Sequence, residues 1–363
     1  MRSTKAIISL AAIKHNLTVL KSLAPSSKVV VVIKANAYGH GAVEVARYLK
    51  DEVCFGVAII DEALELRKAG IDASILVLEG ALGSDELDLA LDNDLELVVQ
   101  NSQQLQKILD KAADYSGNKK LNVWLKFNSG MNRLGFASSD YLSIYQQLAE
   151  CSLVAKITAI SHLACADNIN DPTTQAQLDQ FKLVTKDLPV EKSFANSAGI
   201  IAWPEVHFDW IRPGLALYGC SPMAGNMTGE SHNLKPAMTL VSKLISIRKV
   251  SKGVAVGYSC GWVAERDTRI GVVAIGYADG YPRHISQGSP VLINGKRYSV
   301  VGSVCMDMLT VDLGVDDTIE LDDKVILWGE GLPLDEVAKN ANTIPHTLMC
   351  AVTSRVKYEW LDD

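Results

Sequence analysis

The feature that most constrains this chain is a regular alternation of short apolar segments with amphipathic helical segments over its first two thirds. The apolar segments predict eight strands, at residues 29–33, 54–59, 74–78, 95–99, 121–127, 155–161, 193–195 and 210–212. Helical patterns follow the first five strands, at residues 42–50, 61–69, 84–91, 102–113 and 139–150. Continuously apolar strands joined by helices are typical of parallel sheets buried on both faces. Eight strands in roughly 190 residues predict an α/β fold, a (β/α)8 TIM-type barrel. An open doubly wound sheet is the alternative, but no G-x-G-x-x-G follows any strand, so dinucleotide binding has little support.

The pattern changes after residue 232 to short apolar runs separated by glycine-containing turns. Asn294-Gly295, between two such runs, is a strong signal for a two-residue β-hairpin. We therefore expect a barrel domain over residues 1–232 and a mainly β C-terminal domain over residues 233–363. A first strand at residues 4–8 precedes the barrel strands, so it can pair with the β domain, and a helix capped by Ser9 follows it.

Composition limits the class of partner and the compartment. The formal net charge of −7, from 35 Lys and Arg against 42 Asp and Glu, argues against a general nucleic-acid binder. The seven cysteines form no C-x-x-C pair and no cluster with zinc spacing, so we expect reduced thiols and no metal site. No segment reaches the roughly 20 apolar residues of a membrane span, and no signal peptide is evident. These observations predict a soluble cytoplasmic protein.

Polar and cationic residues follow several of the predicted barrel strands. In a parallel barrel the active site lies at these carboxyl ends. The residues found there are Lys34, Lys126, His162, Asn196, Ser197 and Arg212. Such a set predicts a site for an anionic ligand. Lys34 ends an apolar strand, where partial desolvation favours Schiff-base chemistry, and the small residues after it let a ligand approach the backbone.

At this point the sequence resembles a known family. Residues 32–41 (VIKANAYGHG) look like the pyridoxal-phosphate lysine motif of alanine racemases. The resemblance continues, in family order, at residues 130–135 (GMNRLG), 161–163 (SHL), 195–198 (ANSA), 212–219 (RPGLALYG), 256–258 (VGY), 276–280 (GYADG) and 305–308 (CMDM). It implies a homodimer in which each active site combines residues of both subunits, with no membrane or nucleic-acid partner.

The resemblance also implies roles for individual residues. Lys34 would bind pyridoxal 5′-phosphate covalently, and Lys34 and Tyr258 of the partner subunit would act as the two bases on opposite faces of the substrate Cα. Arg212 would meet the pyridine nitrogen; because arginine does not surrender its proton, the cofactor would be a weaker electron sink, which suits racemisation. The other implied cofactor ligands are Tyr38, His162, Asn196, Ser197, His346 and the backbone N–H groups of Gly214 and Leu215. Arg133, Met306 and Asp307 would contact the substrate, and Lys126 matches a lysine that many family members carry in carbamylated form.

The sequence departs from the family pattern near the predicted site. His346 stands where a tyrosine is usual, Ser303 where an arginine is frequent, and Ser193 where a histidine commonly braces the arginine matched by Arg212. Asn128-Ser129 replaces the more usual Asp-Thr. The leading hypothesis is an alanine racemase that supplies D-alanine for peptidoglycan or degrades it. The alternatives are a serine or broad-specificity racemase, a non-catalytic carrier of pyridoxal phosphate, and a decarboxylase, which Arg212 disfavours.

Overall fold

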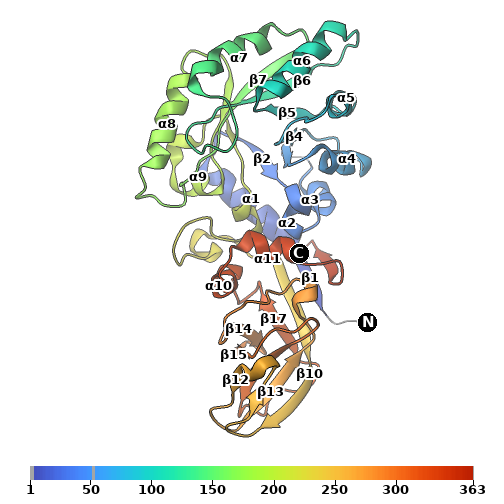
Figure 1. Ribbon diagram of the computed structural model, residues 1–363, viewed down its shortest axis with the longest axis vertical. Helices are drawn as coiled ribbons and strands as arrows, with labels where there is room; N and C mark the ends of the chain where they lie inside the picture. The colour runs from blue at the N-terminus through green and yellow to red at the C-terminus, as the bar shows by residue number, and fades with distance from the viewer. Residues whose placement is uncertain (1–3, 51–53, 363) are drawn as a thin grey trace. The chain divides into compact units, whose positions relative to one another are not determined.

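The computed structural model describes residues 4–50 and 54–362, and these divide into two compact units (Figure 1). The barrel unit comprises Leu17–Leu217 and Pro222–Asn226. The β unit comprises Tyr218–Ser221, Met227–Asp363 and the described part of Met1–Asn16. None of the helices in the described ranges is both long and apolar enough to span a bilayer.

The barrel unit is the predicted (β/α)8 barrel, closed by eight parallel strands in chain order. The strands are β2 (Lys28–Val32), β3 (Cys54–Val57), β4 (Ile75–Val77), β5 (Glu96–Val99), β6 (Leu121–Lys126), β7 (Val154–Ile160), β8 (Glu191–Ser193) and β9 (Trp210–Ile211). The helices are α1 (Leu10–Leu23), whose first half groups with the β unit, α2 (Lys34–Gly39), α3 (Ala42–Leu49), α4 (Ile60–Lys68), α5 (Ser84–Asp92), α6 (Ser102–Asp114), α7 (Ser138–Glu150), α8 (Thr173–Val184) and α9 (Ser197–Ala202), with 3-10 turns at Pro204–Val206 and Leu215–Tyr218.

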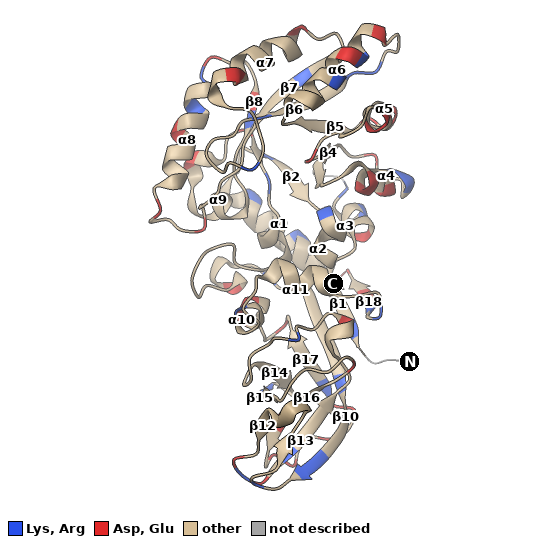
Figure 2. Cartoon of the chain, in the orientation of Figure 1, with Lys and Arg blue, Asp and Glu red and all other residues tan. Residues whose placement is uncertain are grey.

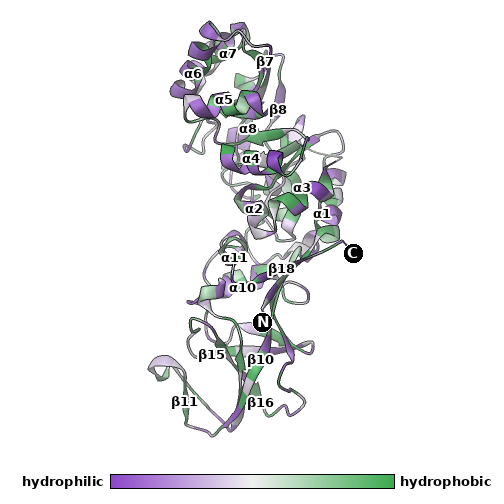
Figure 3. Ribbon diagram, turned by 90° about the vertical axis from the view of Figure 1, so that its right-hand side faces the viewer, coloured by the Kyte–Doolittle hydropathy of each residue, from purple (hydrophilic) through white to green (hydrophobic). Residues whose placement is uncertain are grey.

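Side chains fill the barrel interior, so a ligand can bind only at its rim. Buried residues from six successive strands form one cluster: Val30, Cys54, Leu76, Val98, Trp124 and Ile160. The helices around the barrel mix hydrophobic and hydrophilic residues (Figure 3), and α4 and α5 carry acidic residues in their first turns (Figure 2). The negative charge of the chain therefore lies in part on the outer helices.

The β unit is built around an eight-stranded sheet of order β13-β16-β15-β14-β17-β10-β1-β18, in which β13 also pairs with β10. Its strands are β1 (Lys5–Ser9), β10 (Met238–Val250), β13 (Thr268–Val273), β14 (Pro290–Ile293), β15 (Lys296–Val301), β16 (Leu309–Gly314), β17 (Lys324–Trp328) and β18 (Lys357–Leu361). A separate hairpin, α10, α11 and three 3-10 turns complete it: β11 (Ala255–Val256), β12 (Trp262–Val263), α10 (Leu334–Asn340), α11 (Pro345–Ala351), Gly229–His232, Tyr258–Cys260 and Tyr277–Asp279. The first strand, β1, pairs with β10 and β18.

The division of the chain differs from the expected boundary between residues 232 and 233. Tyr218–Ser221 and the segment from Met227 group with the β unit because their backbone is bonded to it. The Ala237 N–H donates to Tyr218 O at 3.2 Å, and the Ser221 N–H donates to Asp335 Oδ1 at 3.0 Å.

Candidate active site

Lys34 directly precedes a backbone segment of unusual conformation. Residues 35–38, drawn within α2, have φ of 51–53° and ψ of 39–51°, which is a left-handed turn made of four non-glycine residues. The left-handed conformation costs an L-residue roughly 1–2 kcal/mol because Cβ approaches the following carbonyl oxygen. Strained backbone of this kind persists only where its surroundings fix it, and it clusters at functional sites.

His40 and Asn36 hold the far end of this turn. The imidazole of His40 is fully buried, and its Nδ1 lies 2.9 Å from Ala37 O and 3.1 Å from Tyr38 O. Since both carbonyls can only accept, Nδ1 carries the proton and donates. Burial lowers the pKa of His40 to about 4, which keeps the ring neutral. The Asn36 side-chain oxygen accepts from the Ala42 N–H at 2.8 Å, at the start of α3.

Arg212 lies immediately after β9 and is buried, with 5% of its surface exposed. It donates to Ser161 O at 2.6 Å and to the Ser193 hydroxyl at 2.6 Å. It also lies 3.3 Å from His162 Nδ1, which must accept because a guanidinium only donates. Burial, and then the charge of Arg212, lower the pKa of His162, so this ring is neutral at physiological pH. Ser193 thus supports Arg212 in this chain where the family pattern has a histidine.

Lys126 and Arg133 join this cationic group. Lys126 is the last residue of β6, Arg133 lies in the loop that follows, and both line one hollow together with His162. Burial, together with the charges of Arg212, Arg133 and Lys34, lowers the pKa of Lys126 to about 8. These four side chains are all cations close enough to repel one another. The rim is therefore electropositive despite the acidic composition of the chain.

Tyr38, Ser197 and Gly214 lie together at the rim. The Ser197 hydroxyl, at the start of α9, accepts from the Gly214 N–H at 2.9 Å and from the Ala216 N–H at 3.2 Å. A β-carbon placed on Gly214 would lie only 2.7 Å from the Tyr38 hydroxyl, so any larger residue there would displace this hydroxyl. Asn196 caps α9 by accepting from the Gly199 N–H at 3.0 Å, and Leu215 is buried.

Tyr258 belongs to the β unit and is strongly exposed, with 71% of its surface accessible. It follows Gly257, which has φ of 83°, and precedes Ser259 and Cys260, which also have positive φ. A β-carbon on Gly257 would contact Gly302 and Ser303 at 3.5 Å, so the two loops are neighbours. The tyrosine is therefore presented outward on a tightly constrained loop.

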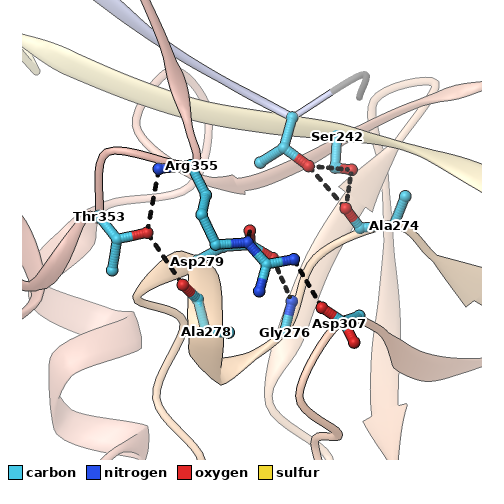
Figure 4. A network of polar contacts seen from close by, with 9 residues as sticks. Ser242, Ala274, Gly276, Ala278, Asp279, Asp307, Thr353 and Arg355 are labelled. Atoms are coloured by element: carbon cyan, nitrogen blue, oxygen red, sulfur yellow. Dashed lines mark hydrogen bonds and ion pairs between the residues drawn. The ribbon is translucent and has the colours of Figure 1, made fainter. Parts of the chain in front are cut away.

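Met306 and Asp307 lie on the second of these loops, and Met306 is 53% exposed. Arg355 donates to Asp307 Oδ1 at 2.6 Å and lies 3.4 Å from the fully buried Asp279 carboxylate (Figure 4). The Ala278 N–H donates to Met306 O at 3.0 Å. Asp307 thus orients the loop through an ion pair within its own chain.

The structure brings the predicted barrel residues together on one rim: Lys34, Tyr38, Lys126, Arg133, His162, Asn196, Ser197, Arg212, Gly214 and Leu215. The remaining predicted residues, Tyr258, Met306, Asp307 and the half-buried His346 in α11, belong to the β unit. The supporting roles of His40, Asp279 and Arg355 were not predicted from the sequence. His40 and Asp279 do lie inside the recognised motifs, whereas no motif includes Arg355.

Comparison with known proteins gives a consistent result. Residues 8–222 match the family model "Alanine racemase, N-terminal domain", and residues 237–360 match "Alanine racemase, C-terminal domain". Alanine racemases from Shewanella amazonensis and Shewanella woodyi are each 47% identical, over 359 and 353 residues, with 97% of both chains covered in each case. The biosynthetic alanine racemase from Pseudomonas aeruginosa has a crystal structure with a TM-score of 0.95 and 44% identity, covering 99% of this chain and 100% of that one.

Proposed function

The chain belongs to the alanine racemase family of isomerases, and from that premise we propose that it interconverts L- and D-alanine with pyridoxal 5′-phosphate held at the barrel rim. The observation that carries the cofactor assignment is the gathering of Lys34, Lys126 and Arg212 at the rim, close enough that the charges of the other two lower the pKa of Lys126. An anionic cofactor and a carboxylate substrate relieve the repulsion among these cations.

The residues of the rim fit this cofactor. The Ser197 hydroxyl, the Tyr38 hydroxyl and the amides near Gly214 form a cluster suited to a phosphate, and a larger residue at 214 would fill it. Arg212 would donate to the pyridine nitrogen, and Lys34 would supply the amine that binds the aldehyde. When bound, the cofactor withdraws electrons from the substrate Cα and so acidifies its hydrogen.

Racemisation needs one proton acceptor and one proton donor on opposite faces of Cα. We assign one face to the Lys34 amine and the other to the hydroxyl of Tyr258 of the partner subunit. The high exposure of Tyr258 supports a role outside its own chain. Arg133 would orient the substrate carboxylate. Met306 of the partner subunit would limit the space beside Cα. This assignment requires a homodimer.

We further propose that Lys126 is carbamylated. Only a neutral amine reacts with CO2, and a lysine with a pKa of about 8 is neutral in about a tenth of molecules at pH 7. The resulting carboxylate would replace a repulsive cation beside Arg133 with an attractive anion. We place the enzyme in the cytoplasm, where it would supply D-alanine for peptidoglycan or degrade it.

A direct test measures racemisation of L-alanine and L-serine by the purified protein with added pyridoxal phosphate. We expect a visible absorbance band that disappears in Lys34→Ala, and a higher kcat/KM for alanine. Loss of activity in Tyr258→Phe, with the band retained, would support the second base. A protein with no band, or with full activity in Tyr258→Phe, would refute the corresponding assignment. A clear preference for serine would overturn the assignment to alanine in favour of the serine racemase that His346 and Ser303 suggest.

A further inference from the structure

The left-handed turn after Lys34 begins at a peptide group that is bound by a neighbouring helix. The Ala35 N–H donates to Glu62 Oε1 at 2.7 Å, and the Ala58 N–H donates to Glu62 Oε2 at 2.7 Å. Ala58 follows β3, and Ala35 follows Lys34, which lies two residues after the end of β2. One carboxylate therefore joins two adjacent loops at the rim of the barrel.

Part of this arrangement recurs in the next two loops. Glu62, Glu86 and Gln104 are each the third residue of their helices, α4, α5 and α6. Each accepts from the N–H two residues before its helix begins; for Glu86 the donor is Leu82, at 2.6 Å. Such a contact closes the loop that leads into the helix, as in a capping box. Glu62 makes this local contact and, in addition, accepts from the Ala35 N–H of a different loop.

We propose that Glu62 is a positioning residue for Lys34, because its carboxylate fixes the first peptide of the left-handed turn that presents Lys34 and Tyr38. The inference rests on the proposed function of Lys34 as the cofactor-binding amine. His40 holds the carbonyls at the far end of the turn, and Glu62 holds the N–H at its beginning. A turn with unfavourable backbone angles needs both ends fixed if Lys34 is to keep one direction.

The chemistry of the side chain explains why a carboxylate is needed. An ionised carboxylate is an acceptor at both oxygens, so it can serve two N–H donors at once. A glutamine has the same shape but offers one oxygen and one NH2 group. Glu62→Gln therefore loses one hydrogen bond and places its NH2 group against a backbone N–H, which is also a donor. Glu86→Gln keeps an oxygen that can accept from the Leu82 N–H. Glu86→Gln is thus a matched control at the same helix position.

The experiment compares wild type, Glu62→Gln and Glu86→Gln as full-length proteins. Hydrogen exchange of a peptide covering residues 33–41 is measured without cofactor, and pyridoxal phosphate is then titrated by its visible absorbance. For Glu62→Gln we expect about tenfold faster exchange and about tenfold weaker cofactor binding, because the loss of one hydrogen bond to a charged group changes an equilibrium by about this factor. We also expect a lower kcat with little change in KM for alanine. Glu86→Gln should match wild type in each measurement.

Unchanged exchange at residues 33–41 in Glu62→Gln would overturn the proposal, as would equal effects in Glu86→Gln. If Glu62→Gln does not fold, Glu62→Asp replaces it; the shorter carboxylate keeps the charge but cannot reach both donors, so faster exchange is again expected. A wild-type protein that neither binds pyridoxal phosphate nor racemises alanine would refute the proposed function. The exchange data would still decide whether Glu62 holds the turn.

Discussion

The ammonium group of Lys126 should lower the stability of the barrel in a way that depends on pH. Burial and the neighbouring cations lower the pKa of Lys126 from 10.5 to about 8. The unfolded chain therefore binds this proton more tightly, so stability rises as the pH increases from about 8 towards 10.5. The difference between the two pKa values corresponds to a cost of about 3 kcal/mol at pH 7.

Lys126→Met removes the charge and keeps most of the side-chain volume. In CO2-free buffer and without cofactor, we expect the variant to exceed wild type in free energy of unfolding by up to about 3 kcal/mol at pH 7. The excess should shrink above about pH 8 and vanish near pH 10.5. Urea unfolding of both proteins across this range gives the difference, in which the other titrating groups cancel.

Lys182→Met is the control, because Lys182 is an exposed residue of α8 and its replacement should leave the curve unchanged. A difference between Lys126→Met and wild type that stays constant from pH 7 to 10.5 would refute the reasoning, and so would a variant less stable than wild type at pH 7. Bicarbonate should stabilise wild type but not Lys126→Met if the amine is carbamylated. A ¹³C resonance from labelled CO2 that is lost in the variant would identify the adduct.

Three further predictions concern the supporting residues. Gly214→Ala should weaken pyridoxal-phosphate binding, measured by absorbance titration, because its β-carbon would meet the Tyr38 hydroxyl. Arg355→Met should raise KM for alanine and weaken the proposed dimer in sedimentation experiments, since it releases the loop of Met306. Arg297→Met, which breaks an exposed ion pair, should do neither. Ser193→Ala should cost about 1–3 kcal/mol in urea unfolding, because buried Arg212 loses an acceptor.

The barrel could be predicted from sequence because its strands are apolar and follow one another in the closed sheet. β8 was the exception: the structure places it at Glu191–Ser193, whereas residues 193–195 were expected. Its polar start conceals it, because Glu191 accepts from Lys28, Lys156 and the Trp210 indole instead of facing an apolar layer. Helices α8, α9 and α11 were also missed, and α9 and α11 are short enough to give little periodic signal.

The candidate site was predictable where chemistry follows directly from chain position. Lys34, Lys126 and Arg212 each stand at or just after the carboxyl end of a strand, so one rule of barrel architecture gathers them. The left-handed turn was not predictable, since Asn36 is the only one of its four residues with a tendency towards positive φ, and one such residue does not specify four in a row. Its contacts are to Glu62 in α4 and to the buried ring of His40. Contacts between loops carry no local sequence pattern.

The electropositive rim is best understood as a cost that the fold bears for binding. The chain has a net charge of −7, so the cations at the rim do not follow from composition. Burial lowers the pKa values of Lys126, His162 and Arg212. Neighbouring cations lower those of Lys126 and His162 as well. Anions that bind at the rim would return part of this free energy. Selection for catalysis can therefore preserve an arrangement that selection for stability alone would remove.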